Sequence, residues 1–298
     1  MIRATTLRAG LVSAALSLLM LPTASLANDM HIVASFSILG NMVEEVVGDL
    51  AEVTTIVGPD ADAHVYQPSV ADARAVAKAD VIFVNGLGFE TWSGTLIAES
   101  DTEAPVYVAT DGITPILVEN ETDPHAWNSL TNGIIYIKNI ADAMSEAAPE
   151  HADAFATNAA RYITELEALD ANTRVRLAEL PAKKRTVVTA HDAFGYLADA
   201  YGLTFLSPLG VDTEAEPSAR DLAVLIAQLK EAGAAALFVE NVTSPALIQQ
   251  ISDETGIEIG GRLFSDALSE RGGPATSYLA MFQHNLDALL DALGDRPS

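Results

Sequence analysis

The sequence predicts an α/β protein in which two βα lobes, each with a mostly parallel sheet, are joined by a long rigid helix. Two observations support this fold class. Short apolar segments alternate with helical patterns in residues 28–148 and again in residues 182–298, and such alternation is typical of parallel βαβ units. Between these regions, the segment from Pro149 to Pro181 contains no glycine and no further proline, so nothing in it interrupts a helix.

Apolar or small residues recur at steps of four and three along this segment, as they do on one face of an amphipathic helix. These residues are Phe155, Ala159, Tyr162, Leu166, Leu169, Leu177 and Leu180. A helix over the whole segment would be about 48 Å long, close to the width of a domain. We therefore predict a bridging helix over 149–181, between an N-terminal lobe (28–148) and a C-terminal lobe (182–298) with a binding cleft between them. The alternative is one long helix inside a single domain.

The first 27 residues have the pattern of a secretory signal peptide. Arg3 and Arg8 precede an apolar run from Leu11 to Leu21, and Ser25 to Ala27 form a small-residue cleavage site. No later stretch approaches the ~20 apolar residues that a membrane-spanning helix needs. Because the chain has no cysteine, we expect no lipid anchor at the cleavage site. The pattern predicts a soluble protein exported to a bacterial periplasm.

The predicted elements of the N-terminal lobe alternate between strands and helices. Its strands are His31–Phe36, Val53–Val57, Val81–Asn85 and Val106–Ala109, and its helices are Ile38–Val47, Ser69–Ala79, capped by Ser69, and Glu90–Ala98. In the C-terminal lobe the strands are Thr186–Ala190, Thr204–Leu209, Ala236–Val239 and Ile257–Phe264. Its helices begin within Asp192–Tyr196 and then cover Asp221–Glu231, Pro245–Gly256 and Ala275–Leu293. The two lobes share no residue-level repeat.

The composition excludes several classes of function. The chain has 41 Asp and Glu against 16 Lys and Arg, with a formal net charge of −25. Such a field repels nucleic acid and anionic lipid and favours cations, although a solvated acidic surface alone would explain it. The absence of cysteine excludes thiolate chemistry, disulfides and cysteine-based zinc fingers.

Two histidines of the N-terminal lobe follow predicted strands, where ligands of open parallel sheets bind. His64 lies in the segment Asp60–Ser69 after the second strand, and His125 lies in Asp123–Trp127 after the fourth. A single loop histidine is most often a surface residue. Here, however, prolines and aspartates restrict the backbone around both histidines, which favours a structured site.

The C-terminal lobe repeats this arrangement with His191 after its first strand and Asp266 after its last. Asp266 could instead serve as a helix cap. Three imidazoles and one carboxylate are typical of a tetrahedral zinc site, whereas calcium or magnesium would require oxygen ligands throughout. Asp123, Asp192 and Glu240 are candidates for hydrogen bonds to the ligating histidines, or caps and solvated charges. We interpret the remaining histidines, His31, His151 and His284, as structural or surface residues.

These motifs together give the chain a family resemblance. The segments GPDADAHVYQPS, DPHAW, TAHDAFGY, EPSARDLAVLI and SDALS occur in the order found in the zinc- and manganese-binding solute receptors of bacterial ABC importers. The resemblance implies that His64, His125, His191 and Asp266 bind the metal. Histidine at the third position is similar to the zinc branch, since the manganese branch has a carboxylate there.

The sequence departs from that family in two places. Many zinc-binding members carry a long loop rich in histidine and aspartate before the second motif, but here the corresponding run from Leu117 to Thr122 is short, acidic and without histidine. A periplasmic metallochaperone that loads the site is one hypothesis for how the missing loop is replaced. Gln67 also stands where a glutamate is common, so a carboxylate near His64 is missing.

The leading functional prediction is a periplasmic receptor, not an enzyme, that captures Zn²⁺, one ion per chain, and delivers it to an ABC permease of the inner membrane. We expect it to act as a monomer. The alternatives are a Mn²⁺ or Fe²⁺ receptor of the same family and, in a different class, a secreted zinc hydrolase or hydratase. An enzyme would need an open coordination position, and a ligating Asp266 would close it.

Overall fold

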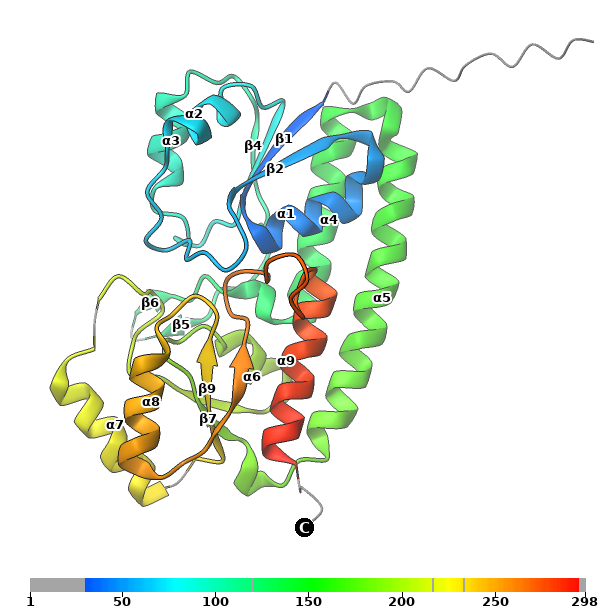
Figure 1. The fold of residues 1–298 in the computed structure, drawn as a ribbon. Helices are drawn as coiled ribbons and strands as arrows, with labels where there is room; N and C mark the ends of the chain where they lie inside the picture. The colour runs from blue at the N-terminus through cyan, green and yellow to red at the C-terminus, as the bar shows by residue number, and fades with distance from the viewer. Residues whose placement is uncertain (1–29, 119, 216, 233, 295–298) are drawn as a thin grey trace, which may run out of the picture.

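The structure is a computed structural model that describes residues 30–118, 120–215, 217–232 and 234–294 (Figure 1). The segment predicted to be a signal peptide, residues 1–27, lies outside these residues. No helix in the described ranges is long and apolar enough to cross a membrane.

The N-terminal lobe contains a four-stranded parallel sheet with the order β2-β1-β3-β4. Its strands are β1 (His31–Phe36), β2 (Glu52–Val57), β3 (Val81–Val84) and β4 (Val106–Val108). The helices that connect these strands are α1 (Ser37–Val47), α2 (Val70–Val76) and α3 (Ser93–Glu99). Strand β3 is buried along its whole length, as expected for a parallel sheet covered on both faces. The predicted cap of α2 is confirmed, because Ser69 and Asp72 form a capping box.

The C-terminal lobe contains a second four-stranded parallel sheet, with the order β10-β9-β7-β8. Its strands are β7 (Thr186–Val188), β8 (Thr204–Leu206), β9 (Ala236–Glu240) and β10 (Ile259–Leu263), and its helices are α6 (Gly195–Tyr201), α7 (Ala219–Ala232), α8 (Pro245–Thr255) and α9 (Tyr278–Leu293). Numbered within each lobe, the strands of both sheets follow the order 2-1-3-4. The lobes therefore repeat one topology although no repeat is visible in the residues.

Several short elements connect the main helices and strands. They are the 3₁₀ turns η1 (Gly48–Leu50), η2 (Ala126–Asn128), η3 (Pro149–His151) and η4 (Ala182–Lys184), and the two-stranded hairpin of β5 (Leu117–Val118) and β6 (Glu121–Thr122). Several predicted strands end earlier than expected. The strand predicted to reach Leu209 stops at Leu206, because Pro208 lacks the N–H that a ladder needs.

The long helix predicted between the lobes is present as α5 (Ala152–Ala178), which runs along the outside of both lobes (Figure 1). It is shorter than the predicted segment 149–181 at both ends. Pro149 begins the 3₁₀ turn η3 rather than an α-helical turn, and the helix stops before Pro181, which disfavours helical geometry in the residue preceding it. Helix α5 packs along α4 (Leu130–Ala147).

Hydrogen bonds fasten α5 to both lobes. Near its start, the Asn158 side chain donates to the carbonyl oxygen of Val46 in α1. Near its end, Arg176 forms an ion pair of 2.8 Å with Asp287 of α9. The buried face of the helix follows the predicted apolar stripe, and Thr173 fills the gap between Leu169 and Leu177 by donating its hydroxyl to the carbonyl of Leu169.

We expect replacement of Leu166 by alanine to lower the free energy of unfolding by about 2–5 kcal/mol, because it leaves a cavity in the core. Leu166 is fully buried at the middle of α5, whereas Val175 on the same helix is 62% exposed. The matched variant Val175→Ala should change stability by less than about 0.5 kcal/mol. Urea unfolding of the metal-free proteins measures both, and equal effects would contradict the assigned buried face.

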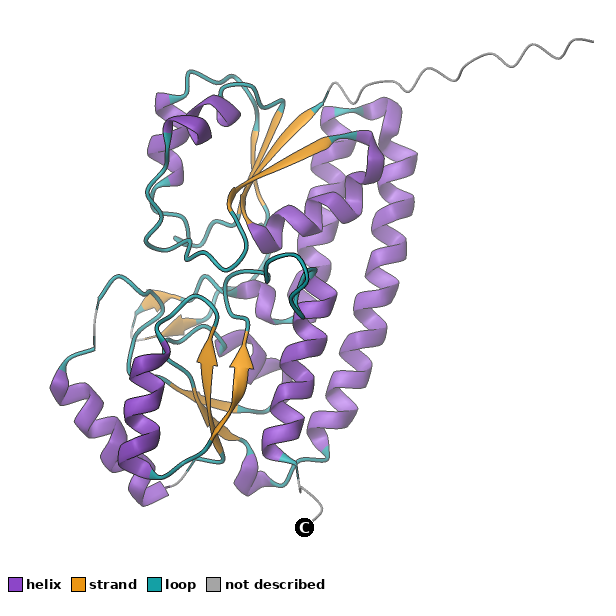
Figure 2. Ribbon diagram, in the orientation of Figure 1, coloured by secondary structure: helices purple, strands orange, loops and turns teal. Residues whose placement is uncertain are grey.

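The carboxyl ends of the two sheets face each other across the boundary between the lobes (Figure 2). In parallel sheets the loops that leave these ends carry the binding residues. The fold therefore gathers loops from both lobes at the boundary between them.

Candidate metal centre

The four residues predicted as metal ligands all follow carboxyl strand ends and meet between the lobes. His64 lies in the turn after β2, and His125 directly precedes η2 after β4 and the β5–β6 hairpin. His191 follows β7, and Asp266 follows β10. Each residue offers one ligand atom, and these four atoms lie within 4.8 Å of one another. The structure thus brings together every residue of the predicted set.

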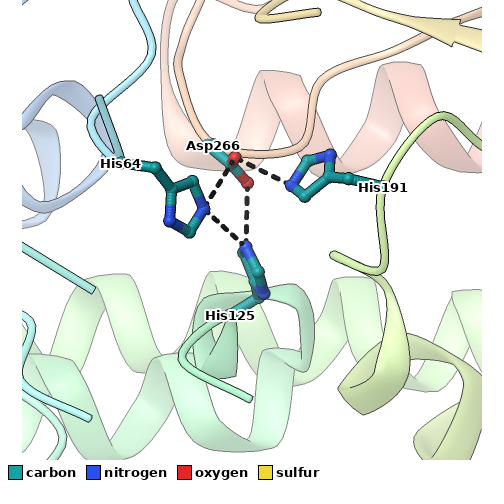
Figure 3. Close-up of side chains that lie close together, drawn as sticks. All are labelled: His64, His125, His191 and Asp266. Atoms are coloured by element: carbon teal, nitrogen blue, oxygen red, sulfur yellow. Dashed lines mark hydrogen bonds and ion pairs between the residues drawn. The ribbon is translucent and has the colours of Figure 1, made fainter. Parts of the chain in front are cut away.

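The imidazole Nε2 atoms of all three histidines point toward the Asp266 carboxylate (Figure 3). His191 Nε2 lies 3.1 Å from Asp266 Oδ2, and His64 Nε2 lies 3.5 Å from the same oxygen. His125 Nε2 lies 3.5 Å from Asp266 Oδ1 and 3.2 Å from His64 Nε2. Two imidazole nitrogens at 3.2 Å share at most one proton, so a cation among these atoms would remove the conflict.

The site is almost completely buried. His125, His191 and Asp266 have no exposed surface, and His64 is 6% exposed. Within the described residues, the two carboxylate oxygens of Asp266 accept no hydrogen bond of normal geometry. The Nε2 atom of His191 also forms none. Buried charged groups that lack hydrogen bonds are costly. A metal ion bound by these atoms would satisfy them, so the residues present fit a metal.

Two carboxylates orient His125 and His191 so that their Nε2 atoms face the other ligands. Asp123 Oδ1 lies 2.8 Å from His125 Nδ1 and also accepts the backbone N–H of His125. Glu240 Oε2 lies 2.7 Å from His191 Nδ1, and Glu240 Oε1 accepts the backbone N–H of His191. A carboxylate at Nδ1 keeps the proton there and leaves the Nε2 lone pair free for a metal. The roles suggested for Asp123 and Glu240 agree with these contacts.

The third candidate, Asp192, occupies a different position. Among the described residues, its carboxylate forms no hydrogen bond or ion pair with the histidines of the site, and its backbone N–H donates to Gly210. Burial, reinforced by the nearby charge of Asp123, raises the pKa of Asp192.

The three histidines predicted to be structural or surface residues lie outside the candidate site. His31 is paired with Glu52, His151 borders Phe155, and His284 contacts the Arg262 carbonyl.

The charges of the site are strongly coupled. Burial alone would lower the pKa of His191, but the carboxylates of Glu240 and Asp266 raise it well above its ordinary value. Burial alone would raise the pKa of Asp266, but His191 and His125 hold it well below its usual range. In the absence of a metal, these carboxylates therefore favour the protonated form of His191.

Aromatic side chains form an apolar wall around the histidines that the sequence did not predict. The Phe89 ring lies 4.8 Å from the His64 ring and 6.0 Å from the His125 ring, and the Trp127 ring lies 5.3 Å from His125. Trp127 also donates its indole N–H to the carbonyl of Ser265, the neighbour of Asp266. Its position in the His125 motif was a usable signal, whereas nothing in the sequence marks Phe89.

The geometry is typical of one class of protein, a two-lobed receptor, here with a buried candidate metal site between its lobes. Comparison with known proteins agrees. Residues 32–292 match the family described as ZnuA, the periplasmic component A of a zinc-uptake complex, and the chain belongs to this family. The chain is thus a metal-binding substrate-binding protein of an ABC transporter, which implies a membrane permease as partner, and it is not an enzyme. The hydrolase or hydratase reading is therefore set aside.

Individual relatives span nearly the whole chain. The iron-binding protein YfeA of Yersinia pestis is 34% identical over 275 residues, covering 90% of this chain and 88% of that protein. The manganese-binding lipoprotein MntA of Halalkalibacterium halodurans is 31% identical over 265 residues, covering 89% and 88%. Each name states the metal of that protein, and the names differ.

Solved structures show the same fold. The periplasmic zinc-binding protein TroA of Treponema pallidum has a TM-score of 0.85 at 29% identity, covering 89% of this chain and 99% of that chain. A manganese-bound periplasmic metal-binding protein of Candidatus Liberibacter asiaticus has a TM-score of 0.82 at 32% identity, with the same coverage. These matches confirm the two-lobe α/β fold.

Removing the carboxylate that orients His191 should weaken metal binding. We expect Glu240→Ala to lower the metal affinity by about tenfold to a hundredfold, the usual effect of losing such a partner. Glu258→Ala removes an exposed glutamate of the same lobe and serves as the control. Isothermal titration with zinc would compare the two, and equal affinities would show that Glu240 does not support the site.

Proposed function

We propose that this chain captures Zn²⁺ in the periplasm and delivers it to its ABC permease, with His64, His125, His191 and Asp266 as the four ligands. The observation that carries the proposal is the ligand set. Three buried imidazole Nε2 atoms and one carboxylate surround one point, and such a set is typical of four-coordinate zinc.

The chemistry of these donors favours zinc over manganese and iron. Manganese prefers oxygen ligands, whereas imidazole nitrogen suits zinc, and the affinity of a given nitrogen site rises from Mn²⁺ through Fe²⁺ to Zn²⁺. Copper would bind still more tightly by the same order, so selection of zinc in the cell depends partly on which metal is available.

A Mn²⁺ or Fe²⁺ receptor is the second candidate, because relatives at 31% and 34% identity are named for manganese and iron. The two candidates differ at this site in one measurable way. When zinc and manganese are offered together, a zinc receptor retains zinc. A manganese receptor would retain manganese as well.

Native mass spectrometry of the mature protein, chelated and then offered equal zinc and manganese, tests the proposal. We expect one zinc per monomeric chain, and no zinc in the variant His191→Ala. A preference for manganese would overturn the zinc assignment while leaving the receptor class intact. The absence of any bound metal would overturn the ligand set itself.

A further inference from the structure

A buried metal site must open before its ion can leave, so the contacts that hold its loops together limit release. The loop that carries His64 belongs to the N-terminal lobe, and Asp266 belongs to the C-terminal lobe. His64 is also the one ligand with measurable exposure, 6% against 0% for the others. The least buried of the four ligands thus lies on the loop that meets the Asp266 loop.

Asp60, four residues before His64, joins the two loops directly. Its backbone N–H donates to the carbonyl oxygen of Leu268 at 2.8 Å. Its carboxylate accepts the backbone N–H of Glu270 at Oδ2 and the side-chain amide of Asn241 at Oδ1, both at 3.1 Å. One exposed aspartate of the N-terminal lobe therefore makes three hydrogen bonds to the C-terminal lobe.

The backbone of Asp60 is in the left-handed region, with a φ of +51°, a conformation that aspartate adopts more readily than most residues other than glycine. A substitution that tests the side chain of Asp60 must therefore tolerate this conformation.

Asn241 connects Asp60 to the loop that carries Asp266 in the C-terminal lobe. It directly follows Glu240, whose carboxylate orients His191. Its side-chain oxygen accepts the backbone N–H of Ser265 at 3.4 Å, and its side-chain nitrogen donates to the carbonyl of Ala267 at 3.1 Å. The amide thus holds the backbone on both sides of Asp266 while it also reaches Asp60.

A second contact between the lobes lies on the same loop but does not involve Asp266. The hydroxyl of Thr213 donates to Asp62 Oδ2 at 2.6 Å, and Asp62 Oδ1 accepts the backbone N–H of His64. The contact through Asn241, by contrast, joins the His64 loop to the residues on both sides of Asp266, so it can couple the two ligand loops.

We propose that Asp60 and Asn241 form a clasp across the lobe boundary that holds the His64 loop against the Asp266 loop and limits how fast the bound metal leaves. Both are positioning residues, since neither side chain reaches the metal site. The inference rests on the proposed ligand set, but it concerns the rate of release rather than the choice of metal.

The test measures metal dissociation into excess chelator, with zinc and again with manganese as the probe. Asp60→Gly removes both carboxylate contacts, and glycine adopts a positive φ without strain. We expect Asp60→Gly and Asn241→Ala each to release metal about tenfold faster, as lost hydrogen bonds to a charged group would allow. The effect of the double variant should be smaller than the product of the two single effects, because both substitutions break the hydrogen bond between Asp60 and Asn241.

Asp101→Gly is the matched control. Asp101 is exposed, has a φ of +55° and lies at the end of α3, so this substitution changes the charge and the backbone in the same way. It should release metal at the wild-type rate. Rates for Asp60→Gly within twofold of the control, or single effects that multiply in the double variant, would overturn the clasp.

A variant that lowers the unfolding temperature of the metal-free protein without changing the rate of metal release would likewise overturn the clasp. That result would show that the contact contributes to stability only. If Asn241→Ala does not fold, the comparison of metal release rates between Asp60→Gly and Asp101→Gly still tests the clasp. Failure of the proposed function gives a different result. A wild-type chain that retains neither metal would overturn the ligand set and the clasp together, whereas slow release from every variant would overturn the clasp alone.

Discussion

Replacing Asp266 by alanine is expected to lower the affinity for zinc by more than about a hundredfold, because the loss of an outer partner alone costs up to that much. Asp266 is fully buried and is the point on which all three imidazole Nε2 atoms converge. It is also the one carboxylate among the four proposed ligands. Competition with a chromogenic chelator at pH 7.5 measures the change.

Asp192→Ala is the control for this experiment. Asp192 follows His191 directly and is also an aspartate, but within the described residues its carboxylate forms no hydrogen bond or ion pair with the histidines of the site. This variant should retain zinc nearly as tightly as the wild type. Equal affinity in Asp266→Ala and the wild type would show that Asp266 is not a ligand and would leave a coordination position open.

Acidification is expected to release the metal steeply. Binding requires neutral imidazoles, and the pKa of His191 in the metal-free protein is raised well above 6.5 by the neighbouring carboxylates of Glu240 and Asp266. The neutral form of His191 therefore dominates only above that raised pKa. As the pH falls through it, protons displace the metal, and the affinity should fall by at least about tenfold per pH unit below neutrality.

Two readouts check the pH dependence. Calorimetry at pH 7 in buffers of different ionisation enthalpy should detect the proton that leaves His191 when zinc binds. Dialysis at pH 4.5 should remove the metal, with Asp266 still ionised because its pKa is held low. Retention of zinc at pH 4.5 would contradict a site built from three histidines.

The fold was largely predictable because local patterns dictate it. The period of the apolar residues predicted α5, and the alternation of strands and helices predicted two parallel sheets. The identical strand order of the two sheets could not be predicted, since it depends on which strands pair, and no residue repeat records it. The ends of α5 were missed because Pro149 begins a 3₁₀ turn and because the helix stops before Pro181.

The candidate site was predictable to the extent that each member follows a strand in a restricted motif. His64, His125, His191 and Asp266 meet as expected, and the orienting contacts of Asp123 and Glu240 followed from the general needs of a ligating histidine. The Asp60–Asn241 contact was not predicted, because it joins residues from separate lobes and depends on the packing of the two lobes rather than on any local pattern.

The measurement that tests the central claim most directly is a crystal structure of the zinc-loaded protein with anomalous data at the zinc edge. The ligand set predicts a single zinc peak between the lobes, with the Nε2 atoms of His64, His125 and His191 and one oxygen of Asp266 at about 2.0–2.2 Å. A zinc ion elsewhere, or one that holds water in place of Asp266, would contradict it.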